Sequence, residues 1–180
     1  NGDWLGEWTN NIKLWKPKIE GGKWKYMLID TDYGFGLKGS VNDNRLQMAR
    51  YPTSPAPNHN SEIFDALLDN PVFKNYFINR YADLMNTVYL PANVENVMKQ
   101  FKDSMAFDMV AHFAKWGSDT TAWNGRIENM MNFAIQRPAI TRNFIRDEFN
   151  LTSDVLLTIN TIPVGSGRIE ISTVIPSAYP

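Results

Sequence analysis

The chain has 180 residues, of which 43% are hydrophobic and 21% are charged, and its formal net charge is −1 at pH 7. These values are typical of a folded domain and exclude a chain that is disordered throughout. A charge near zero gives no long-range attraction to nucleic acid or anionic lipid, and no run approaches the ~20 apolar residues that a membrane span requires. We therefore expect neither a nucleic-acid partner nor a membrane span in this chain.

Cysteine is absent, which excludes disulfides, thiolate zinc sites and a cysteine nucleophile. The only histidines are His59 and His112, so a histidine-rich metal site is excluded as well. The sequence starts at Asn1, with neither an initiator methionine nor a signal peptide. We expect it to be an excised piece of a longer protein.

The first part of the chain predicts a β-hairpin. Residues 12–15 alternate apolar and polar side chains, and residues 23–29 begin with the same alternation and end in a continuous apolar run. The connection contains Pro17, Gly21 and Gly22, which are typical turn residues. Residues 37–60 are polar and rich in proline, and we expect a long loop there.

Apolar side chains at helical spacing then predict four helices. The first begins at Ser61, the second follows Asn70-Pro71, and the third runs from Pro91 toward Phe113. The fourth covers 127–149, and we expect Pro138 to interrupt or restart it.

Charged side chains gather near the end of that last helix. We expect Arg137, Arg142 and Arg146 to form a solvated face that pairs with Asp147 and Glu148. Such exposed ion pairs contribute little individually.

The sequence pattern changes near Asn150, where we place a domain boundary. Residues 155–159 and 168–172 resemble two strands joined through Gly165-Ser166-Gly167. We expect 1–150 to form one domain and 151–180 to be the truncated start of a β-sandwich-like or repeat module.

Carboxylates follow the apolar end of the hairpin. Asp30 and Asp32 come directly after Met27-Leu28-Ile29, and in an extended chain residues two apart face the same side. Oxygen ligands held close together suit Mg²⁺, which keeps positions for water or phosphate. The Tyr33-Gly34-Phe35-Gly36 segment then allows a sharp turn.

Further polar residues precede the hairpin. Asp3 and Asn10-Asn11 are spaced as in phosphotransfer sites, in which one Asp orients or deprotonates a hydroxyl while an Asn and a strand-end Asp hold magnesium on nucleotide phosphates. An Asp-x-Asp pair is also common in turns and helix caps. From these residues alone, a metal site and a surface turn both remain open.

Several motifs occur in a consistent order along residues 1–150: Asn1-Gly2-Asp3-Trp4, Asn10-Asn11-Ile12-Lys13-Leu14-Trp15, Gly22-Lys23-Trp24-Lys25-Tyr26, Ile29-Asp30-Thr31-Asp32-Tyr33-Gly34-Phe35-Gly36, the helix from Asn70 to Leu84, and Trp123 followed by Arg137-Pro138. Together they resemble the spore-coat protein H (CotH) kinase family. Members of that family are described as kinases that phosphorylate serine in spore-coat proteins, with relatives on bacterial and fungal surfaces.

The resemblance implies an α+β, mainly α fold: an atypical protein-kinase-like C-terminal lobe, with a short hairpin and active-site loops before a helical bundle. By position, Asp3 matches the catalytic-loop Asp. Asn11 and Asp30 match the residues that hold the metal and nucleotide, and Asp32 is a further candidate metal ligand. The implied cofactors are ATP with Mg²⁺ or Mn²⁺, and the implied partner is a serine-containing protein substrate.

The chain departs from the family pattern in one loop, where Glu7-Trp8-Thr9 separate Gly6 from Asn10. The resemblance also places a nucleotide-clamping lobe upstream of Asn1, so we expect residues 1–180 to be inactive alone. An alternative is a non-catalytic pseudokinase that serves as a surface interaction or adhesion domain. The terminal segment resembles β-repeats of exported bacterial proteins, which favours a location outside the cell or on its surface.

Overall fold

The computed structural model describes residues 11–52 and 59–167 and is mainly helical, with one small sheet. This confirms the expected α+β, mainly α class. Strands β1 (Ile12–Trp15) and β2 (Lys25–Leu28) pair antiparallel, with Ile12 opposite Leu28 and Trp15 opposite Lys25. The Lys25 ammonium lies over the Trp15 ring, 5.2 Å from its centre, so the alternating pattern and the cross-strand pair agree.

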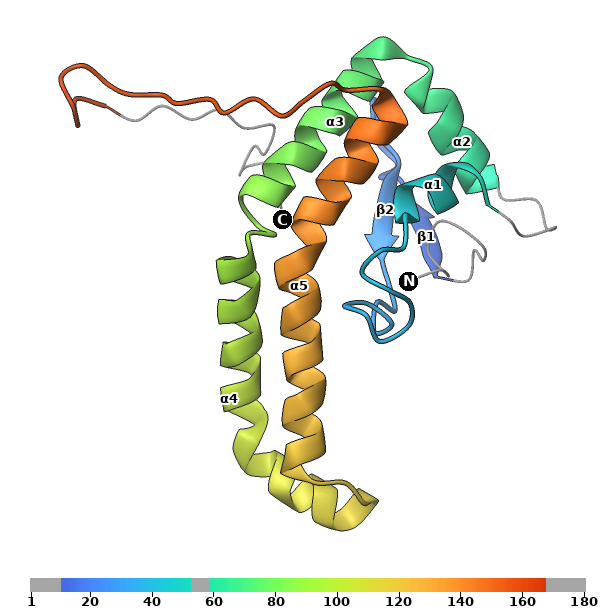
Figure 1. Cartoon of the computed structure of the whole chain (residues 1–180). Helices are drawn as coiled ribbons and strands as arrows, with labels where there is room; N and C mark the ends of the chain where they lie inside the picture. The colour runs from blue at the N-terminus through green and yellow to red at the C-terminus, as the bar shows by residue number, and fades with distance from the viewer. Residues whose placement is uncertain (1–10, 53–58, 168–180) are drawn as a thin grey trace.

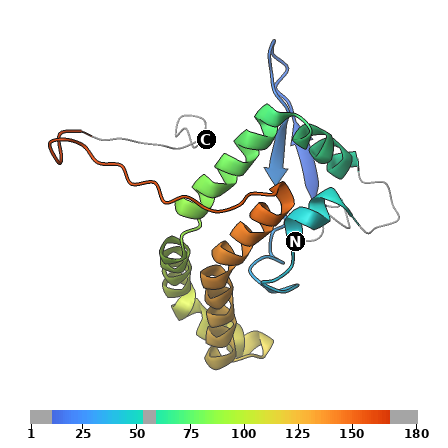
Figure 2. The same ribbon diagram turned by 45° about the horizontal axis from the view of Figure 1, so that its top comes forward.

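Five helices follow within these described ranges: α1 (Arg45–Arg50), α2 (His59–Leu68), α3 (Pro71–Asn86), α4 (Pro91–Trp116) and α5 (Thr120–Phe149). Figure 1 shows α4 and α5 side by side as a long hairpin, with β1, β2, α1 and α2 gathered beside the C-terminal part of α5. The same arrangement is visible after rotation in Figure 2. No helix in the described ranges is both long and apolar enough to cross a membrane.

Side-chain caps explain where two of the helices begin. The Asn70 side-chain oxygen accepts hydrogen bonds from the backbone N–H groups of Val72 and Phe73 at 2.9 and 3.3 Å, and Pro71 fits the first turn of α3. The Asp119 carboxylate caps α5 by accepting from the Ala122 N–H at 2.7 Å. The start of α3 agrees with the prediction, whereas α5 begins seven residues before the predicted residue 127.

Helix α1 lies within the segment that the sequence predicts to be a loop, so that expectation is wrong for residues 45–50. Asn44 caps this helix by accepting from the Gln47 N–H at 3.0 Å. Ala49 is buried, and Arg50 binds carboxylates on α2 and α5. A helix of six residues is too short to show a periodic pattern, and tertiary contacts stabilise it instead.

Pro138 does not interrupt α5, which runs unbroken from Thr120 to Phe149. A proline inside a helix removes one backbone hydrogen bond and costs about 3 kcal/mol. Buried Ala134, Thr141 and Ile145 flank it on both sides, so packing offsets this cost. The helix ends at Asn150, whose left-handed backbone (φ 52°) forms the C-cap, close to the predicted boundary.

The segment after α5 contains no strand between residues 151 and 167, so the strand predicted at 155–159 is wrong for the structure. A strand requires a hydrogen-bonded neighbour, and none of the described residues pairs with this segment. Its side chains are largely exposed, with Leu156 at 93%. The second predicted strand, 168–172, lies outside the described residues.

Candidate functional site

The β-hairpin brings two predicted site residues together. Because Ile12 pairs with Leu28, Asn11 and Asp30 leave the sheet at the same end, where β1 begins and β2 finishes. The Asn11 amide nitrogen donates to the backbone carbonyl of Asp30 at 3.5 Å. Residues 19 positions apart in sequence therefore become neighbours through strand register alone.

The chain turns sharply at Asp30, whose φ of 51° places a non-glycine residue in the left-handed region. Such backbone costs energy, and strained positions of this kind concentrate at functional sites. A turn follows at once, in which the Gly34 N–H donates to the Thr31 carbonyl at 2.9 Å. The expectation that Asp30 and Asp32 face the same side assumed an extended chain. That assumption is wrong, because the backbone turns between the two residues.

Asp3, the predicted catalytic residue, lies outside the described residues. The three candidate metal ligands lie within them, on the loops that flank the hairpin. Across 11–52 and 59–167, no three acidic or histidine side chains group closely enough to form a complete cation cage. The donors that are present are the Asn11 amide oxygen and the carboxylates of Asp30 and Asp32, which are the hard oxygen ligands that Mg²⁺ prefers. Mg²⁺ keeps several waters and phosphate oxygens as ligands, so these residues match it in donor type.

The loop after Asp32 is fastened to α5 by two aromatic rings. Phe35, whose φ is 49°, packs edge-on against Phe133, with the ring centres 6.2 Å apart. Gly36 lies at φ 83°, and a Cβ there would come within 3.0 Å of the Phe133 ring. Only glycine combines this backbone with so close an approach. The Gly-Phe-Gly segment therefore sets the distance between the loop and the helix.

Arg137 provides the second fastening point and corrects an expectation. It is half-buried rather than part of a solvated face, and its guanidinium donates to the Val41 backbone carbonyl across the interface. The guanidinium carbon lies 5.8 Å from the centre of Phe133 and 5.4 Å from that of Phe144. Its planar shape suits stacking on these rings while it donates at its edge.

Burial also shifts the pKa values of two side chains in this region, Arg137 and Tyr81. Burial lowers the pKa of Arg137, and the charges of Tyr81 and Asp43 offset part of that change. Burial raises the pKa of Tyr81, although the Arg137 charge and a hydrogen bond with Thr141 act in the opposite direction.

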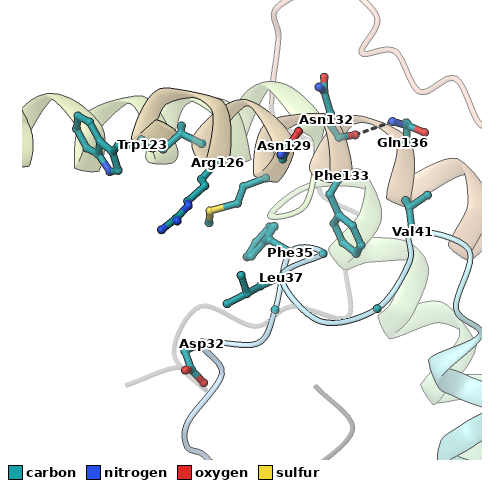
Figure 3. A pocket seen from close by; sticks show the side chains of 15 residues that line it. Asp32, Phe35, Leu37, Val41, Trp123, Arg126, Asn129, Asn132, Phe133 and Gln136 are labelled. Carbon is teal, nitrogen blue, oxygen red and sulfur yellow. Dashed lines mark hydrogen bonds between the residues drawn. The ribbon is translucent and has the colours of Figure 1, made fainter. Parts of the chain in front are cut away.

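A groove of about 720 Å³ lies between this loop and the N-terminal half of α5. Figure 3 shows Arg126 and Phe133 on the side of α5 that faces the loop, with Phe35 and Leu37 close to Phe133, and Asp32 farther from α5 with its carboxylate directed away from the helix. Sequence reasoning missed this groove. Four of the eight α5 residues that line it (Trp123, Arg126, Met130 and Phe133) follow an i, i+3, i+7, i+10 spacing that marks one face of a helix, so the periodicity contained a clue.

An ion-pair network lies at the opposite end of the interface. Arg50 binds Asp65 on α2, with its Nη2 at 2.6 Å from the Asp65 carboxylate, and Glu148 on α5, with its Nη1 at 2.5 Å from the Glu148 carboxylate. Burial alone would lower the pKa of Arg50, but the hydrogen bond and charge of Asp65, with charges from Tyr51 and Glu148, raise it. Glu148 was expected on the solvated face and is instead 12% exposed. The network joins three helices behind the site.

Taken together, a hairpin with hard oxygen donors at its open end, backed by a helical bundle, defines an α+β protein with the residue types of a phosphotransfer site. The family model for CotH kinase protein matches residues 1–141. The chain therefore belongs to the CotH kinase family, and this membership indicates a kinase-like function with ATP and a divalent cation as general cofactors. No curated protein and no solved structure gives a significant match.

Proposed function

We propose that this chain forms the C-terminal, kinase-like lobe of a Mg²⁺-dependent phosphotransferase that moves the γ-phosphate of ATP to serine in a protein. The observation that supports this most is the hairpin register, which puts Asn11 beside Asp30, two residues before Asp32 in the groove lining. Membership of a kinase family supplies the chemical context.

The proposed roles follow from the donor types. Asp30, with Asn11 and Asp32, would hold the divalent cation, whose charge stabilises the phosphate oxygens during transfer. The serine oxygen forms a bond to the γ-phosphorus while the bond to the β–γ bridging oxygen breaks and ADP leaves. Asp3, assigned by its match to the family motif, would orient the serine hydroxyl and accept its proton.

Phosphate transfer from radiolabelled ATP by the full-length protein tests this proposal. With Mg²⁺ or Mn²⁺ we expect labelled protein, and we expect Asp30→Asn to reduce the rate by at least about 100-fold, as removal of one transition-state contact commonly does. The neutral amide is similar in size to the carboxylate, so the fold should survive.

Asp154→Asn is the matched control, because Asp154 pairs with Arg146 on an exposed surface beyond α5. It makes the same chemical change and should leave the rate unchanged. Equal rates in all three proteins would contradict the assignment of Asp30. No transfer in the wild type, with ATP also failing to raise its melting temperature, would favour a non-catalytic interaction domain.

We also propose that the protein acts at the cell surface or outside the cell. The support is the resemblance of the terminal segment to β-repeats of exported bacterial proteins. Protease treatment of intact cells should remove the protein if it is displayed on the surface. Protection of the protein until the cells are lysed would contradict this location.

A further inference from the structure

We propose that the groove between residues 32–41 and α5 binds the acceptor polypeptide, and that Arg126 selects acceptors with an acidic residue near the serine. This inference rests on the proposed phosphotransfer function. It goes further by assigning a surface and a class of substrate sequence. Asp32, a candidate cation ligand, is one of the residues that line the groove, so a polypeptide bound there would pass beside the proposed cation site.

The groove walls suit an apolar side chain. Leu37 is 62% exposed, Phe35 38% and Met130 36%, and all three line the groove. Aromatic and methionine side chains on a concave surface are typical of peptide-binding sites, because they provide a large and adaptable contact area. An acceptor with one apolar residue close to its serine would cover these atoms.

Arg126 gives the groove its charge preference. Among the described lining residues it is the only basic side chain, it is exposed, and Figure 3 shows it on the side of α5 that faces the loop. Within the described part of the chain its guanidinium makes no ion pair and no hydrogen bond. Other arginines of this region have partners: Arg137 donates to Val41, Arg142 to Asn86 and Arg146 to Asp154. The other charged residue that lines the groove is Asp32, which is assigned above as a candidate cation ligand, so the unpaired Arg126 guanidinium is the group that can pair with an aspartate or glutamate of the bound chain.

The loop that forms the other wall is held in place before any ligand binds. Phe35 packs on Phe133, and Arg137 fixes Val41, so both ends of the loop are attached to α5. A preformed groove loses little conformational freedom on binding, which favours a short extended peptide as its occupant. Stretches of extended chain recognised by side-chain pockets are a common mode of substrate binding.

The test uses short fluorescent peptides, each with one serine and one leucine, and with aspartate or lysine at each remaining position in turn. Binding is measured by fluorescence anisotropy without nucleotide, and phosphate transfer is measured separately with the full-length protein. We expect a preference of about fivefold for aspartate near the serine, the size that a partly exposed ion pair supports. Arg126→Glu should reverse it in favour of lysine.

Each change in the groove has a matched control on the exposed surface of α4: Lys99→Glu for Arg126→Glu, and Val110→Ser for a second groove variant, Leu37→Ser. Lys99→Glu makes the same charge reversal on the exposed surface of α4 and should leave the peptide preference unchanged. Leu37→Ser should weaken binding about tenfold by removing an apolar wall. Val110→Ser changes an equally exposed residue of α4 (63% exposed) and should have no effect.

The outcomes separate this inference from the proposed function. Transfer that proceeds while Arg126→Glu leaves the preference unchanged would overturn the groove assignment and leave the phosphotransfer proposal standing. If the wild type transfers no phosphate, the binding data decide alone: a reversed charge preference supports the groove as a polypeptide site, and an unchanged one overturns it. Displacement of the peptides by ATP would show that nucleotide occupies the groove and would also overturn the inference.

Discussion

The two halves of α5 differ in what surrounds them. In the C-terminal half, from Ala134 onward, Ala134, Thr141 and Ile145 are buried against the other elements, and Arg137 and Glu148 fasten α5 to the loop and to Arg50. The N-terminal half contacts α4. No residue in this half of α5 is fully buried, and no residue of α4 is fully buried. The C-terminal half therefore stabilises the fold through buried side chains, while the N-terminal half is more exposed and contributes Phe133 to the loop contact and most of the α5 residues that line the groove.

The largest expected effect comes from removing packed atoms in the C-terminal half. Ile145→Ala should destabilise the protein by about 2–4 kcal/mol, because a buried side chain is replaced by a cavity. Phe107→Ala, at a residue of α4 that is 90% exposed, should change stability by less than about 0.5 kcal/mol. Urea unfolding followed by circular dichroism measures both. Similar losses in the two variants would show that the halves do not differ as described.

Breaking the ion-pair network should be the next largest effect. Arg50→Met leaves the Glu148 carboxylate, 12% exposed, without its counterion, and should cost about 2–3 kcal/mol. Arg146→Met removes an exposed pair with Asp154 and should cost less than about 1 kcal/mol. Adding Glu148→Gln to Arg50→Met should recover part of the stability, since the unpaired charge is then removed. An additive loss in that double variant would contradict the network.

The loop attachment can be tested at Gly36. Gly36→Ala should destabilise the protein by about 1–3 kcal/mol, because an alanine is strained at φ 83° and its Cβ would meet the Phe133 ring at 3.0 Å. Gly125→Ala lies in the exposed half of α5, where the new methyl group would have no neighbour within 4 Å, and should instead stabilise the protein by about 0.5–1 kcal/mol. Thermal unfolding measures both variants. A stabilising Gly36→Ala would refute the close packing of the loop on Phe133.

The smallest effect concerns alkaline pH. Burial raises the pKa of Tyr81 above its ordinary value of 10.0, so the folded protein keeps this proton at a pH where the unfolded chain loses it. The stabilising contribution is complete below about pH 10 and is lost as pH rises through the folded pKa. Tyr81→Phe should make the free energy of unfolding less dependent on pH above that point. An unchanged pH profile would show that Tyr81 is not the responsible group.

Local chemistry made much of the fold predictable. The alternation around Ile12 and the glycines before Lys23 predicted the hairpin, and Asn70-Pro71 and Pro91 predicted two helix starts. Features that depend on tertiary contacts were not predictable. Helix α1 needs the partners of Arg50, and the continuity of α5 through Pro138 needs packing on both sides.

The candidate site also contains features that the sequence could predict and features that it could not. The approach of Asn11 to Asp30 follows from strand pairing and could be predicted from the hairpin. The left-handed backbone at Asp30, which turns the chain before Asp32, depends on the surrounding structure and was missed. Arg137 was assigned to solvent because a sequence does not show that Val41, 96 residues earlier, would supply its acceptor.

The measurement that tests the central claim most directly is paramagnetic broadening of backbone amide NMR signals by Mn²⁺ with ATP. We expect that signals of residues 11–13 and 29–32 broaden first, that α4 is unaffected, and that Asp30→Asn abolishes the effect. Broadening centred on other carboxylates, such as Asp103 and Asp108 of α4, or identical broadening in the variant, would contradict a cation site at the open end of the hairpin.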